Sequence, residues 1–318
     1  MKIALVIFIT LALAGCALLS LHMGVIPVPW RALLTDWQAG HEHYYVLMEY
    51  RLPRLLLALF VGAALAVAGV LIQGIVRNPL ASPDILGVNH AASLASVGAL
   101  LLMPSLPVMV LPLLAFAGGM AGLILLKMLA KPPQPMKLAL TGVALSACWA
   151  SLTDYLMLSR PQDVNNALLW LTGSLWGRDW SFVKIAIPLM ILFLPLSLSF
   201  CRDLDLLALG DARATTLGVS VPHTRFWALL LAVAMTSTGV AACGPISFIG
   251  LVVPHMMRSI TGGRHRRLLP VSALTGALLL VVADLLARII HPPLELPVGV
   301  LTAIIGAPWF VWLLVRMR

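Results

Sequence analysis

Charged side chains are scarce in this chain of 318 residues: they make up 10% of it, whereas hydrophobic residues make up 61%. The mean hydropathy is +1.00. A soluble domain needs far more polar surface than this composition provides, so that class is excluded. The composition predicts an all-α, polytopic helical membrane protein with one transmembrane domain over residues 1–318, in contact with membrane lipid. The net charge of +9 is scattered through short loops, which excludes a nucleic-acid partner.

Cysteine chemistry and nucleotide-binding loops are also missing. The four cysteines, Cys16, Cys148, Cys201 and Cys243, stand singly and form no Cys-x-x-Cys pair, so we expect neither a metal centre nor a disulfide framework. No Gly-x-x-x-x-Gly-Lys-Ser/Thr loop occurs, and no lysine follows a glycine. We therefore expect no cofactor and no enzymatic activity; any ATP hydrolysis would belong to a partner.

What is present is a series of apolar runs long enough to cross about 30 Å of hydrocarbon. They lie near residues 3–21, 55–76, 85–103, 107–126, 138–158, 182–200, 226–243, 268–287 and 298–315. A further run near 246–260 is short and follows Gly244-Pro245. With ten spans and a cytoplasmic N-terminus, 14 of the 21 Lys and Arg residues lie inside; without a crossing at 246–260 the inside has only 9. The positive-inside rule therefore predicts ten spans and cytoplasmic termini.

The first span resembles a cleavable signal because LAGC ends at Cys16. The apolar character continues through Leu19, so we expect a retained helix. On the outer side, residues 24–50 and 170–180 are rich in Trp and Tyr, which predicts short helices near the headgroups.

A polar insert, residues 201–225, separates two of the spans and has its own helix signals. Asp203 and Asp211 are candidate N-caps, and Gly210 and Gly218 are candidate helix ends. Two helices this short need a packing partner. An interfacial lipid-binding helix would be richer in Lys and Arg, so the insert, which the charge count places in the cytoplasm, favours docking to a protein.

Several other polar residues are candidates for function. Arg51 and Arg54 of RLPR, with Arg288, lie at outer span ends, where they either snorkel to phosphates or receive carboxylates from a docking protein. Asp284 can pair with Arg288 at i, i+4. Asp154 has no evident partner, so it either lines a polar path or caps a neighbouring helix.

Two motifs in loops have simpler explanations. Residues 41–43, His-Glu-His, offer two imidazoles without a third ligand, which is typical of a solvated loop. In RNPLASPDILG, residues 77–87, Asn78-Pro79 ends one helix, and Ser82 followed by Pro83 predicts the start of the next.

Together, the motifs resemble the membrane subunits of ATP-driven importers for ferric siderophores and vitamin B12. The similarity rests on RLPR at 51–54, RNPLASPDILGV at 77–88, LALGDARATTLGV at 207–219, GPISFIGLVVPHMMR at 244–258, HRRLLP at 265–270, ADLLAR at 283–288 and ELPVGVLTAIIGAPWFVWLL at 295–314. Asn89, His90, Ala91 and Ala92 depart from the small Gly-Ala element that relatives have there, which puts pore-lining roles near the start of that span in doubt.

The resemblance implies a permease subunit in the bacterial inner membrane that moves an iron(III) chelate, with ferric citrate expected, by alternating access. Its implied partners are cytoplasmic ABC ATPase subunits, a periplasmic substrate-binding protein and a second, homologous permease. It assigns ATPase coupling to residues 204–219, with the individual positions Leu207, Gly210, Asp211, Ala212, Ala214, Leu217 and Gly218. It assigns docking of the binding protein to Arg51, Arg54 and Arg288. The rival hypothesis is an ion-coupled transporter or channel with Asp154 as its coupling site.

Overall fold

The computed structural model of the chain describes residues 2–131, 135–161, 164–292 and 294–316. Those residues contain helices and no strands. The long helices are α1 Lys2–His22, α3 Leu52–Val76, α4 Val88–Leu102, α5 Leu111–Leu129, α6 Pro135–Ser159, α8 Trp180–Leu196, α11 Val221–Cys243, α12 Ile249–Thr261, α13 His265–Ile289 and α14 Val298–Arg316. The short ones are α2 Ala32–Thr35, the π-helix η1 Tyr45–Arg51, η2 Val108–Val110, α7 Val164–Leu171, η3 Ser197–Phe200, α9 Cys201–Leu207 and α10 Asp211–Thr216.

Each of the ten predicted spans coincides with one of the long helices. Among the described residues, seven helical stretches are long and apolar enough to cross a membrane. The stretches containing α4 and α14 are shorter apolar helices. Helix α12 has 13 residues, a length of about 20 Å. The helix that begins after Gly244-Pro245 therefore exists, and its crossing stays a prediction from charge.

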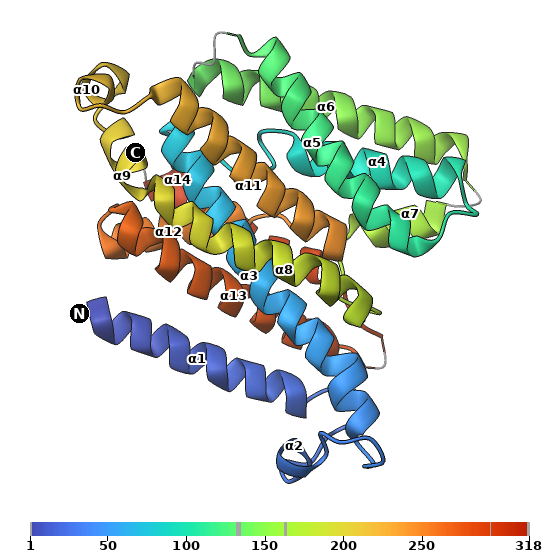
Figure 1. Cartoon of the computed structure of the whole chain (residues 1–318). Coiled ribbons are helices and arrows are strands. Elements are labelled where there is room, and N and C mark those ends of the chain that lie inside the picture. Colours follow the sequence, from blue (N-terminus) through green and yellow to red (C-terminus); the bar gives the residue numbers. More distant parts are fainter. Residues whose placement is uncertain (1, 132–134, 162–163, 293, 317–318) are drawn as a thin grey trace.

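Helix α3 lies at the centre of the bundle and is buried over nearly its whole length. It packs against α13, α11, α12 and α8, while α4, α5 and α6 form a neighbouring group that α11 joins to the rest. Figure 1 shows α1 along one side of the bundle, with α9 and α10 near the end at which α14 finishes, and α2 at the opposite end.

Glycines allow the central helices to approach closely. A Cβ atom at Gly69 would collide with the carbonyl oxygen of Gly250 in α12, and one at Gly62 would collide with that of Gly276 in α13. Small residues at such crossings are typical of membrane helix pairs, because dispersion contacts replace the hydrophobic effect between helices in lipid. These two crossings fix α3 against both later helices.

The loop of RNPLASPDILG differs from the prediction. Arg77 ends α3 in a left-handed conformation with φ 54°, and the Asn78 side chain accepts a hydrogen bond from the Leu80 N–H at 2.9 Å. The next helix starts only at Val88, after Gly87 with φ 80°, so the predicted N-cap at Ser82 is wrong. Turns fill the interval, because the left-handed conformation of Gly87 does not allow a continuous helix from Ser82 into α4; the Asp84 carboxylate accepts a hydrogen bond from the Asn89 side chain.

Candidate functional site

The polar insert forms two short helices, as predicted, but the first is not separate from the membrane helix before it. Helices α8, η3 and α9 follow one another without a break from Trp180 to Leu207. Asp203 lies in the first turn of α9 and accepts a hydrogen bond from the Thr224 hydroxyl at 2.8 Å. Its predicted role as an N-cap is therefore wrong, because the chain is already helical before it.

Asp211 is likewise not a cap. Gly210, with φ 103°, occupies the N-cap position of α10, and Asp211 is the first helical residue. Its carboxylate accepts hydrogen bonds from Nη1 and Nη2 of Arg225 at 3.0 and 2.9 Å. Nη2 of Arg77 lies 3.3 Å from the same carboxylate. Asp211 thus joins α10 to helix α11 through Arg225, and to the end of α3 through Arg77.

The end of α10 matches the prediction closely. Gly218 has φ 86°, and its N–H bonds to the carbonyl of Thr215 at 3.0 Å. The N–H of Val219 reaches back to the carbonyl of Ala214, also at 3.0 Å. This pair of bonds is a Schellman motif, which requires a residue tolerant of positive φ at the position of Gly218.

The apolar residues of the insert divide between the bundle and the surface. Leu207 and Ala214 are buried, at 1% and 0% exposed. Leu217 is 49% exposed and Ala212 is also exposed. Leu209, which the sequence reasoning did not select, is 51% exposed beside Gly210. The exposed apolar surface of the pair therefore includes Leu209, Ala212 and Leu217, whereas Leu207 and Ala214 anchor the helices.

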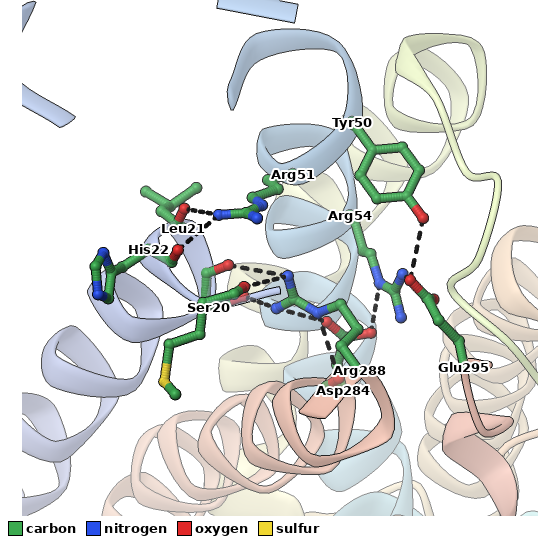
Figure 2. Close-up of polar contacts among 10 residues, drawn as sticks. Ser20, Leu21, His22, Tyr50, Arg51, Arg54, Asp284, Arg288 and Glu295 are labelled. Atoms are coloured by element: carbon green, nitrogen blue, oxygen red, sulfur yellow. Dashed lines mark hydrogen bonds and ion pairs between the residues drawn. The ribbon is translucent and has the colours of Figure 1, made fainter. Parts of the chain in front are cut away.

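The three arginines at the opposite end are directed inward. Arg51, Arg54 and Arg288 are 3%, 2% and 2% exposed. The expectation that their guanidinium groups face outward is wrong for this conformation, because backbone carbonyls and carboxylates of the same chain bind them (Figure 2). Their docking role stays a prediction that this geometry does not favour.

Arg51 and Arg288 bind the carboxyl end of α1 from two different helices. Arg288 Nη1 donates to the carbonyls of Ser20 at 3.0 Å and Met23 at 3.3 Å, and its Nη2 donates to the Ser20 hydroxyl. Arg51 donates to the carbonyls of Leu21 and His22, and to that of Ile26 in the following loop. The last carbonyls of a helix have no partner within the helix, so these two side chains satisfy them.

Arg54 sits between two carboxylates. Its Nε lies 2.7 Å from Asp284 Oδ1, and its Nη1 lies 2.6 Å from Glu295 Oε2. Tyr50 donates its hydroxyl hydrogen to Glu295 at 3.2 Å. Figure 2 shows the guanidinium plane of Arg54 between Asp284 and Glu295. The predicted pair of Asp284 and Arg288 also forms, at 3.3 Å.

Asp154 lies beside a polar cavity of about 260 Å³ that several elements line together. The cavity is bounded by Asp84, Asn89, His90, Ser93, Ala150, Thr153, Asp154, Leu171, Pro245 and Ser247. Asn89 is 4% exposed, and neither its Oδ1 nor the Nδ1 of His90 has a hydrogen-bond partner among the described residues. An adjoining groove shares Leu171, Pro245 and Ser247 and continues along α14. The structure therefore places Asp154 with polar neighbours that are far from it in sequence.

The His-Glu-His segment makes ordinary loop contacts. His43 Nδ1 lies 2.9 Å from Asp36 Oδ2, and His41 Nδ1 lies 3.0 Å from the carbonyl of Gln38. The described part of the chain has no group of three His, Cys, Asp or Glu residues able to bind a metal ion.

The sequence of this chain matches a known transport family over almost its whole length. The model of the FecCD transport family matches residues 10–316. The chain belongs to the FecCD transport family. The resemblance drawn from the seven motifs is thereby confirmed, together with the all-helical membrane permease fold.

Individual relatives agree with this membership. The Fe(3+) dicitrate transport system permease protein FecD of Escherichia coli (strain K12) is 99% identical over 318 residues, covering 100% of both chains. The Fe(3+)-citrate import system permease protein YfmE of Bacillus subtilis (strain 168) is 43% identical over 97% of this chain and 94% of its own. A solved inward-facing ABC transporter assigned to the metal-chelate type superposes with a TM-score of 0.87 at 30% identity, covering 99% of this chain and 100% of that one.

Proposed function

We propose that this chain is the membrane-spanning permease of an ATP-driven importer that moves ferric citrate from the periplasm to the cytoplasm. The observation that carries the proposal is the 99% identity, over the full length of both chains, to a permease named for Fe(3+) dicitrate transport. The chain itself needs no nucleotide-binding loop, because partner ATPase subunits supply the hydrolysis.

The transport mechanism is alternating access driven from the cytoplasmic side. The termini and helices α9 and α10 face the cytoplasm, which agrees with the 14 of 21 basic residues in the segments assigned to that side. A periplasmic binding protein delivers the chelate to the opposite end. ATP binding closes the ATPase subunits, and the helix pair transmits this movement to the bundle as a rigid-body change.

The ATPase docks on the exposed face of the helix pair. Leu209, Ala212 and Leu217 are small or apolar and exposed, and such residues fit the groove of a partner protein. Gly210 and Gly218 shape the two ends of α10, while Leu207, Asp211 and Ala214 attach the pair to the bundle. The seven coupling positions therefore have three different roles: docking, shaping the ends of α10, and attachment to the bundle.

A second, homologous permease completes the membrane part of the importer. The exposed apolar surface of helix α6 supports a contact with this second permease. It includes Leu140, Leu152 and Leu158, at 69%, 43% and 81% exposed. Helix α14 has Ile304 and Val311 exposed at 60% and 58%. The polar cavity beside Asp154 opens near these helices, so Asp154 lines the transport path.

Transport of defined cargo tests the proposal. We expect proteoliposomes with this chain, a homologous permease, the ATPase and the binding protein to take up ⁵⁵Fe-labelled ferric citrate when ATP is present on the ATPase side. Equal uptake of a hydroxamate siderophore by the same complex would contradict the assigned cargo. A complex assembled from this chain alone, with full activity and two identical permeases, would contradict the heterodimer.

A further inference from the structure

Three carboxylates bind the helix pair to the transmembrane bundle. Asp203 accepts a hydrogen bond from Thr224 at the start of α11. Asp211 accepts two from Arg225, the residue that follows Thr224, at 3.0 and 2.9 Å. These contacts join both α9 and α10 to the first turns of the same membrane helix.

The third carboxylate joins α9 to a different membrane helix. Asp205 Oδ1 accepts hydrogen bonds from the backbone N–H of His265 at 3.0 Å and from its Nδ1 at 2.6 Å. His265 is the first residue of α13 and is 2% exposed, so Asp205 satisfies one of the N–H groups that α13 leaves unpaired. The contact is therefore built into the start of α13.

The packing beneath this contact brings α3 into the same assembly. A Cβ atom at Gly74 of α3 would lie 3.1 Å from both His265 Nε2 and a methyl carbon of Leu204. Leu204 is fully buried. Helix α9 also continues from α8 through η3 without a break. The first helix of the pair is thus attached to α3, α8, α11 and α13.

The backbone on either side of helix α10 holds it less firmly than the continuous helix holds α9. It has six residues and lies between Gly210 and Gly218, both with positive φ. Glycine is the residue with the widest range of backbone conformations, so α10 could pivot at both ends. The two-bond contact of Asp211 with Arg225 opposes that movement, because a bidentate ion pair fixes orientation as well as distance.

We infer that Arg225 and His265 are positioning residues that couple movement of the helix pair to helices α11 and α13. This inference rests on the proposed docking of the ATPase to the pair. Neither side chain belongs to the exposed face of Leu209, Ala212 and Leu217, since Arg225 is 7% and His265 is 2% exposed. Their loss should leave the ATPase bound and active, but should let α10 or α9 move without moving the bundle.

The test compares ATP hydrolysis with transport in the same proteoliposomes, containing the full importer and ferric citrate. The variants are Arg225→Gln and His265→Gln, with Arg225→Lys as the conservative replacement. Arg267→Gln is the matched control, because Arg267 is an exposed basic residue in the first turn of α13. We expect both Gln variants to retain ATPase assembly and hydrolysis while iron transported per ATP falls several-fold.

Two further results are expected. Arg225→Lys should recover part of the transport per ATP, because it keeps the charge and loses only the two-bond geometry. Arg267→Gln should match the wild type. Unchanged transport per ATP in both Gln variants, with the ATPase assembled, would overturn the inference and leave the proposed function intact.

A separate measurement identifies failure of the proposed function itself. Cysteines placed at Leu209 and Leu217 in the otherwise wild-type importer should cross-link to the ATPase with a short bifunctional reagent. Assembly of an active importer without cross-linking at either position would overturn docking on the helix pair, and the inference would fall with it.

Discussion

The Nε atom of Arg54 lies 2.7 Å from Oδ1 of Asp284, although 230 residues separate them in the chain. Both side chains are nearly inaccessible, at 2% and 1% exposed. The pair joins α3 to α13, and Glu295 extends it to the segment before α14. One buried cation thus fixes three parts of the chain at the end of the bundle opposite to the helix pair.

Replacing Arg54 with Leu should strongly destabilise the protein. The substitution leaves Asp284 and Glu295 close together without their shared counter-charge, and removing one member of a buried pair costs about 3–5 kcal/mol. Thermal unfolding in detergent should show a large fall in Tm. Arg31→Leu is the control, because Arg31 is exposed, and a Tm for Arg54→Leu within error of this control would contradict the account.

Replacing Arg288 with Met should loosen the end of α1 more than the rest of the bundle, because Asp284 loses its pair with Arg288 but keeps its shorter pair with Arg54. Removal of the guanidinium leaves the carbonyls of Ser20 and Met23 without their donor, at a cost of about 1–3 kcal/mol each if they stay buried. Hydrogen exchange should rise in the last turns of α1 and remain low in α3. Equal exchange in wild type and variant would show that this capping is dispensable.

Adding a methyl group at a helix crossing should separate two helices. Gly69→Ala places a Cβ against the carbonyl of Gly250, and overpacking of this kind costs about 1–3 kcal/mol. The matched control is Gly15→Ala in α1, where a Cβ has no atom within 4 Å. We expect the Tm of Gly69→Ala to fall below that of wild type and the Tm of Gly15→Ala to stay close to it. The same Tm in both variants would contradict the close crossing of α3 and α12.

The carboxyl group of Asp84 should make stability depend on pH. Burial raises its pKa from 3.8 to about 6, against the opposing effect of hydrogen bonds from Asn89 and the Phe248 N–H. A raised folded-state pKa favours the protonated form, so its contribution to stability is complete below about pH 4 and is lost as pH rises through about 6.

Asp84→Asn removes this titration. The Tm of the variant relative to wild type should therefore increase between pH 4 and pH 7, and Glu42→Gln, which replaces an exposed carboxylate, serves as the control. A constant difference in Tm across this range for Asp84→Asn would show that the carboxyl group does not titrate there.

The positions of the long helices could be predicted because apolar runs and their length determine them directly. The end of α10 could also be predicted, since Gly218 supplies the positive φ that a Schellman motif needs. The start of α4 could not. Ser82-Pro83 is a good local start signal, but the Asp84 carboxylate bonds to Asn89 and to the N-cap residue of α12, which lies far away in sequence.

The partners of the arginines could not be predicted either, because most of them are distant in sequence. Sequence spacing reveals the pair of Asp284 and Arg288 because they are one helical turn apart. It gives no sign that Glu295 and Tyr50 meet at Arg54, or that Ser20 meets Arg288, since those contacts depend on how α1, α3 and α13 pack. The two candidate caps of the insert, Asp203 and Asp211, similarly look like caps until their partners Thr224 and Arg225 in α11 are known.

The energy source for uptake is the most direct test of the central claim. Proteoliposomes containing the complete importer and its binding protein should take up ferric citrate only when ATP is supplied to the ATPase subunits, and dissipating every ion gradient should leave the initial rate unchanged. Uptake by this chain without an ATPase, driven by a proton or sodium gradient and abolished by Asp154→Asn, would contradict the account and establish an ion-coupled transporter instead.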